Sequence, residues 1–235
     1  MSVSETRLAN EAKETGRIEA FSDGVFAIAI TLLILDIKVP REISDAPTLV
    51  NELVKQWPAY LAYVISFATI GIMWINHHRL LTLITHADHA FLLLNTYLLF
   101  WIAFVPFPTS LLAEYIPRES EVAMIGARVY SGMGVMLAVA FNLLWRYAAR
   151  KNRLLDKRAN PDSVSAVSRS YAFGPLVYLL ALALAFVSAQ ASVALNMLLA
   201  LFFALPDVSR RSIYDGHSGQ GSGVTDQSLP ENNDL

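Results

Sequence analysis

Polar side chains interrupt the first long apolar stretch of this 235-residue chain, over residues 18–39. Arg17, Ser22 and Asp23 stand at its start, Thr31 lies near its middle and Asp36 near its end. An aspartate inside a membrane is costly unless it is paired, so such residues mark a functional or a structural site. Two kinds of chemistry fit them: an ion pathway, or a polar network that ties helices together.

The spacing of the apolar residues in this stretch defines one helix face. Ile28, Thr31, Leu32 and Leu35 stand at intervals of three, four and seven residues, which places them on the same side of an α-helix. Asp23 precedes Ile28 by five residues, or roughly 140° around the axis, so we expect it to pack against other helices. On pattern alone, a lipid-facing or bundle-core stripe is the favoured interpretation.

Further polar residues occur at the same predicted membrane boundary as Asp23. The second and third apolar stretches place Trp74, His77, His78 and Asn95 within about two helical turns of it. We expect a polar network that holds the first helix upright, and its predicted members are Arg17, Phe21, Ser22, Asp23, Trp74, His77 or His78, and Asn95. Arg17 lies eleven residues before Ile28, which places it nearly on the same helix face as Ile28. Its side chain must therefore reach sideways to join the network, or else face the cytoplasmic vestibule.

Asp36 lies where the first helix leaves the membrane on the outer side. Two interpretations have equal weight. Carboxylates at a pore mouth concentrate cations, whereas a solvated charge at a helix end would simply face Lys38 or Arg41.

Composition excludes several other functions. The chain has no cysteine, and its net charge of −2 offers no basic field for nucleic acid. We expect no metal site and no cofactor, because the histidines are too few and wrongly spaced for a membrane di-iron centre; four of the five cluster at His77, His78, His86 and His89. An intramembrane enzyme is the weakest hypothesis, since the chain has no nucleophile motif.

The elements that must position these residues are membrane helices. The sequence is 54% hydrophobic and 16% charged, whereas soluble domains carry about a quarter charged residues. A membrane span needs roughly 20 apolar residues. The sequence predicts an all-α polytopic membrane protein with six transmembrane helices. Four cover residues 18–39, 57–76, 90–113 and 122–145, and the last two come from residues 171–205, divided at 189–191. Residues 1–16 form a polar cytoplasmic N-terminus, 17–206 the transmembrane domain and 207–235 a disordered cytoplasmic tail.

Small and rigid residues refine this prediction. Pro106 and Pro108 should kink the third helix, and three glycines in the fourth should permit close helix packing: Gly126, Gly132 and Gly134. Most of the 18 Lys and Arg residues fall on the side that holds both termini, which predicts that both ends are cytoplasmic.

The first three stretches resemble a known family, the transmembrane protein 175 potassium channels. The resemblance rests on Arg17-Ile-Glu-Ala-Phe21-Ser22-Asp23, on the following Gly-Val-Phe-Ala-Ile-Ala-Ile-Thr-Leu-Leu-Ile-Leu, on Trp74-Ile-Asn-His-His78-Arg79, on Asn95 and on Pro106-Phe107. It implies a homotetrameric, potassium-preferring cation channel, with the first helix lining the pore and no selectivity loop of the usual potassium-channel kind.

The resemblance also implies roles for the stripe. Ile28 matches the main apolar constriction, Leu32 and Leu35 match the next apolar layers, and Thr31 matches the hydroxyl position associated with ion preference. The expected partners are K+ and other monovalent cations, membrane lipids and further copies of the chain, in a prokaryotic plasma membrane. The alternative is a secondary ion-coupled transporter, which would require an inverted repeat and broken helices at the midplane. We find no repeat, and the first helix has no Gly or Pro break at its centre.

Overall fold

A computed structural model describes residues 3–41, 43–115, 121–150, 154–155 and 161–204. Residues 1–205 form one compact unit, whereas residues 206–235, including the predicted disordered tail, form a second unit that lies outside the described residues. The described elements are helices, together with one isolated bridge between Ile84 and Leu155. They are α1 (Val3–Leu32), the 3-10 helix η1 (Leu33–Asp36), α2 (Ala46–Lys55), α3 (Trp57–Thr82), α4 (His89–Phe104), α5 (Pro106–Tyr115), α6 (Glu121–Ala149), α7 (Pro161–Leu184) and α8 (Ala189–Ala204).

In the described part of the chain, five helical segments are long and apolar enough to cross a membrane. They are Thr15–Asp36, Trp57–Thr82, His89–Tyr115, Glu121–Ala149 and Val167–Leu184. A sixth apolar helix, Ala189–Leu201, is shorter than these. The prediction of an all-α protein with several spans is confirmed, and a sixth span at α8 stays a prediction.

Several helix ends differ from those predicted. Helix α1 begins at Val3, inside the predicted polar N-terminus, because its Glu, Ala and Lys residues are good helix formers although they are not all apolar. Helix α7 begins at Pro161, well before residue 171. The break before α8 falls at residues 185–188, because the Ser188 hydroxyl oxygen accepts a hydrogen bond from the Ala191 N–H and caps that helix.

The helix α2 was not predicted. Asp45 caps it by accepting hydrogen bonds from the Thr48 backbone N–H and hydroxyl, both at 2.8 Å, and these donors lower the pKa of the Asp45 carboxyl. Its large apolar residues form two adjacent pairs that lie one helical turn apart, with polar residues between them. All four are exposed: Leu49, Val50, Leu53 and Val54. A search for long apolar stretches overlooks such a short amphipathic helix.

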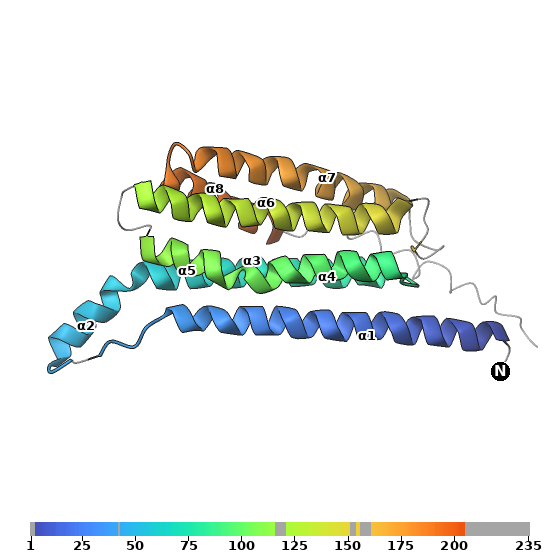
Figure 1. Cartoon of the computed structure of the whole chain (residues 1–235), viewed down its shortest axis with the longest axis horizontal. Helices are drawn as coiled ribbons and strands as arrows, with labels where there is room; N and C mark the ends of the chain where they lie inside the picture. The colour runs from blue at the N-terminus through green and yellow to red at the C-terminus, as the bar shows by residue number, and fades with distance from the viewer. Residues whose placement is uncertain (1–2, 42, 116–120, 151–153, 156–160, 205–235) are drawn as a thin grey trace, which may run out of the picture. The chain divides into compact units, whose positions relative to one another are not determined.

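The third predicted helix is interrupted where proline was expected to kink it. Helix α4 ends at Phe104 and α5 begins at Pro106, which lacks a backbone N–H to continue the ladder. Close packing is present at two of the three glycines of α6: a Cβ at Gly134 would lie 2.7 Å from the Tyr178 ring, and one at Gly126 would lie 3.4 Å from a backbone oxygen. Helices α6 and α7 accordingly run side by side (Figure 1).

Helix α1 packs on α3 and α4 through one face. Where its burial is described, its buried apolar residues are Ile18, Phe26 and Ala29, and the last two join the hydrophobic core together with Leu33 of η1. The Phe26 ring lies 5.4 Å from the imidazole of His77. Figure 1 shows α1 as a long helix beside these neighbours. One side of α1 is therefore fixed by its own bundle.

Candidate functional site

The opposite side of α1 carries the predicted stripe, and it is exposed in the single chain. Ile28 is 61% exposed, Leu32 43% and Leu35 63%. Thr31 is also exposed, and its hydroxyl donates a hydrogen bond of 2.9 Å to the Ile28 carbonyl. The stripe thus faces away from the helices that hold α1, while Leu35 itself lies in η1.

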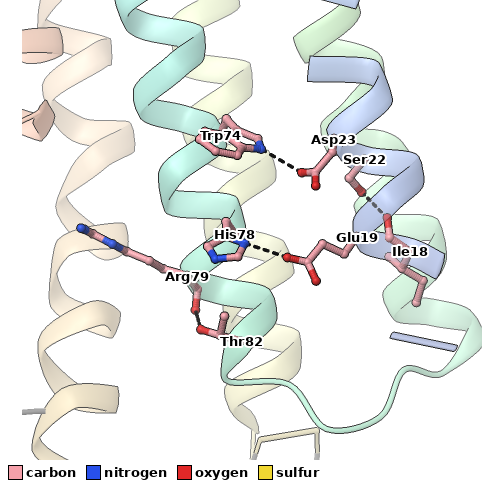
Figure 2. A network of polar contacts seen from close by, with 8 residues as sticks. All are labelled: Ile18, Glu19, Ser22, Asp23, Trp74, His78, Arg79 and Thr82. Carbon is pink, nitrogen blue, oxygen red and sulfur yellow. Dashed lines mark hydrogen bonds and ion pairs between the residues drawn. The ribbon is translucent and has the colours of Figure 1, made fainter. Parts of the chain in front are cut away.

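A seam of polar contacts joins α1 to α3 on the flank between these two faces (Figure 2). The Trp74 Nε1–H donates to Asp23 Oδ1 at 2.8 Å, and His78 Nδ1 bonds Glu19 Oε1 at 2.7 Å. In both helices the partners are four residues apart, one turn of helix. Asp23 is therefore paired, as the cost of an isolated intramembrane carboxylate requires.

A second set of contacts is buried and links three helices. His77 Nε2 and Asn95 Oδ1 are 2.8 Å apart, Asn95 Nδ2 donates to Ser22 Oγ at 3.0 Å, and the Ser22 hydroxyl donates to the Ile18 carbonyl at 2.8 Å. Because the amide oxygen of Asn95 can only accept, Nε2 of His77 carries the proton. These hydrogen bonds run in one direction, because His77 of α3 donates to Asn95 of α4, which donates to Ser22 of α1.

The structure brings together six of the eight predicted network residues. They form the exposed seam and the buried chain just described, and both His77 and His78 take part. Arg17 and Phe21 are not brought in: both are exposed, and in the described part of the chain the Arg17 guanidinium makes no hydrogen bond or ion pair. Both residues lie on the stripe side of α1, as the eleven-residue spacing from Arg17 to Ile28 had suggested.

Glu19 is the contact residue that sequence reasoning missed. Its signal was present, since Glu19 precedes Asp23 by four residues just as Trp74 precedes His78. Residues four apart lie on one face of a helix, one turn from each other, so two antiparallel helices that pair at one of these positions can pair again at the next. The seam could have been found by matching these spacings.

Asp36 is half-buried, and a hydrogen bond to a neighbouring helix holds its carboxylate. Its Oδ1 accepts a hydrogen bond of 2.6 Å from Ser110 of α5, and its Oδ2 is buried without a partner among the described residues. The Lys38 ammonium instead donates to the Leu35 carbonyl, so the expected pairing with Lys38 is wrong. Asp36 thus joins the end of η1 to α5.

A buried polar cluster in the second half of the chain was also missed. The Ser131 and Ser192 hydroxyls are 2.8 Å apart, Asn196 Nδ2 donates to Ser131 Oγ at 2.9 Å, and Ser192 Oγ donates to the Ala181 carbonyl. Ser192 and Asn196 share one face of α8, four residues apart. The cluster joins α6, α7 and α8.

No group of three or more His, Cys, Asp or Glu side chains stands together as a metal site within the ranges that the structure describes. The candidate site is instead the stripe, a row of apolar side chains with the one hydroxyl of Thr31, on a helix that hydrogen bonds hold to its neighbours. Such a surface can line a pathway or cover another helix.

Comparisons with known proteins identify relatives across most of the chain. The family model described as the endosomal/lysosomal potassium channel TMEM175 matches residues 17–106. A potassium channel of Chamaesiphon minutus is 51% identical over 84% of this chain and 97% of its own, and a potassium channel of Streptomyces collinus is 48% identical over 83% and 94%. The crystal structure of a lysosomal potassium-selective channel TMEM175 homolog from Chamaesiphon minutus superimposes with a TM-score of 0.73 at 48% identity, covering 82% of this chain and 97% of that one.

Proposed function

Because this chain belongs to the TMEM175 family, we propose that it is a potassium-preferring cation channel whose pore is lined by α1 and narrowed at Ile28. The names of its relatives support a channel rather than an enzyme. They also disfavour the transporter alternative, as does α1, which continues without a break from Val3 to Leu32.

The observation that carries this proposal is the exposed stripe on a helix that is otherwise anchored. One chain supplies a single copy of Ile28, Thr31, Leu32 and Leu35, and one helix cannot enclose a pathway. Four copies around an axis would place each of these residues in a ring, so we propose a homotetramer. The bundle face of α1 would then hold the ring in place, and the stripe would face the axis.

The stripe has the chemistry for a size-dependent constriction. Ile28 offers no oxygen to replace the hydration shell of an ion, so a narrow isoleucine ring excludes water and a wider one passes a partly hydrated ion. Thr31 differs, because its hydroxyl proton is already donated to the Ile28 carbonyl. Its oxygen lone pairs are therefore free to face a cation, which supports a role in ion preference.

The polar contacts of α1 serve as its anchors in this proposal. Asp23 and Glu19 hold the helix to α3, the Asn95 amide holds it to α4, and Asp36 holds its outer end to α5. A pore helix touches its own subunit on one side only, so its tilt depends on these bonds. We propose that they set the width of the ring at Ile28. Asp36, half-buried at the outer end, also stays our candidate for the outer mouth.

The setting follows from the same proposal. The chain is an integral membrane protein, and we propose a prokaryotic plasma membrane with both termini cytoplasmic. K+ and other monovalent cations would be the permeant species, with no cofactor. Membrane lipids would surround the remaining helices.

Ion flux in liposomes tests the constriction. Ile28→Ala should raise K+ flux and weaken discrimination against Na+, because the ring becomes wider. Ile125→Ala is the matched control, since Ile125 is 53% exposed on α6, outside the stripe, and should leave both quantities unchanged. Parent-like flux and ion preference in Ile28→Ala would place the constriction elsewhere.

Native mass measurement of the purified protein tests the assembly. A tetramer is expected, since each chain contributes one pore helix. A monomer or a trimer that still conducts would refute the proposal.

A further inference from the structure

A partly open cavity lies between α3 and the second half of the chain. Two of its walls are helical stripes of equal length: Thr69 to Asn76 on α3 and Tyr171 to Tyr178 on α7. Seven residues of helix measure ~10 Å, so the cavity is elongated along both helices. Small residues make the hollow, since Ala138 of α6 and Ala200 of α8 are also in its lining.

Close packing of one ring limits how the wall of this cavity can move. A second, smaller cavity shares Thr69, Met73 and Tyr178 with it. The Tyr178 ring stands between the two and rests on Gly134, where a Cβ would come within 2.7 Å of it. The ring therefore cannot move toward α6 to fill the hollow.

Two polar groups in the wall have no partner. Among the described residues, neither the Tyr178 hydroxyl nor the Asn76 side-chain amide makes a hydrogen bond, although both residues lie within membrane-spanning helices. In hydrocarbon an unsatisfied polar group is costly, so a partner from outside the chain is favoured. The rest of the wall is mainly apolar, which disfavours a filling of water.

We propose that this cavity is a binding site for one acyl chain of a membrane phospholipid. The cavity is partly open, and most of its lining residues lie in membrane-spanning helices, where lipid is the surrounding solvent. Its apolar walls suit an alkyl chain, and the Asn76 amide suits an ester oxygen of a lipid. Asn76 lies less than two turns before the end of α3, at a depth where ester groups occur. This inference requires a membrane-embedded chain and does not depend on ion conduction.

Photo-crosslinking in liposomes tests the site directly. The full chain is reconstituted with a phosphatidylcholine that carries a diazirine on its acyl chain, irradiated, and mapped by peptide mass spectrometry. We expect adducts on Met73 and Phe141 in the cavity, as well as on Phe173, which is 63% exposed outside it.

Cavity-filling variants supply the control. Ala138→Leu should abolish the adducts at Met73 and Phe141 and leave those at Phe173 unchanged. Ala172→Leu makes the same change at an exposed alanine of α7 and should alter neither. If Ala138→Leu is not monodisperse, Ala200→Leu fills the cavity from α8 instead.

The outcomes separate this proposal from the channel function. Cavity residues that stay unlabelled in the parent, or equal labelling in parent and filled variants, would overturn the lipid site. Cavity adducts in liposomes that show no K+ flux would leave the lipid site standing and overturn the channel proposal.

Discussion

Replacing Asn95 by alanine removes the central link between three helices. Asn95 is 3% exposed, and it accepts from His77 and donates to Ser22 in the buried chain of hydrogen bonds. Alanine offers neither group, so the His77 N–H becomes a buried donor without an acceptor. Among the described residues, the polar contacts that then still hold the first helix are its seam with α3 and the bond from Asp36 of η1 to Ser110 of α5.

The size of the effect follows from these contacts. Two intramembrane hydrogen bonds at ~0.6 kcal/mol each set the lower limit, and stranding a buried donor costs about 1–3 kcal/mol. We therefore expect Asn95→Ala to lower the free energy of unfolding by about 1–3 kcal/mol. Ser22→Ala should act through the same chain, so the double variant should lose less than the sum of the two single variants.

Unfolding in mixed detergent micelles, titrated with a denaturing detergent, measures this quantity. Thr96→Ala is the matched control, because the Thr96 hydroxyl is exposed and donates only to Leu92 of its own helix. Its effect should stay within about 0.5 kcal/mol. The reasoning fails if Asn95→Ala is as stable as Thr96→Ala, or if the Ser22 and Asn95 effects add without coupling.

Three further predictions concern packing, ion preference and the outer contact. Gly134→Ala should lower the free energy of unfolding by about 1–3 kcal/mol, because its Cβ meets a tyrosine ring at 2.7 Å, whereas Gly132→Ala meets nothing within 4 Å and should be neutral; equal stabilities in micelles would contradict this. Thr31→Val should reduce the preference for K+ over Na+ in liposome flux without changing the assembled mass, and an unchanged preference would argue against the hydroxyl. Ser110→Ala removes the hydrogen bond to Asp36 and should lower the free energy of unfolding by about 1–3 kcal/mol. An unfolding midpoint equal to that of the parent would refute this.

Much of the fold could be predicted because hydropathy is a local property. The apolar stretches predicted the membrane helices, and Pro106 predicted the break between α4 and α5. The amphipathic helix α2 was missed since its apolar side chains are spaced one turn apart instead of running continuously. Helix ends were misplaced wherever capping or helix propensity, rather than hydropathy, decides them, as at Val3 and Ser188.

The candidate site was predicted in part. The motif around Asp23 identified the helix and its polar residues, and the spacing from Ile28 to Leu35 predicted one face that the structure leaves exposed. Arg17 was grouped with the network by its motif, although its position around the helix places it on the exposed side. Glu19 was overlooked because its signal, a four-residue spacing to Asp23 that matches the spacing from Trp74 to His78, appears only when two helices are compared.

The sequence by itself determined the membrane helices and the two faces of α1, since both depend on residue types at fixed intervals along one helix. Only the tertiary structure decided which residues meet between helices. Asp23 bonds Trp74, Asn95 bridges His77 and Ser22, and Asp36 turns to Ser110 rather than to Lys38. The physical reason is that such pairs depend on the rotation and depth of neighbouring helices, which packing sets and which apolar residues along a single helix do not record.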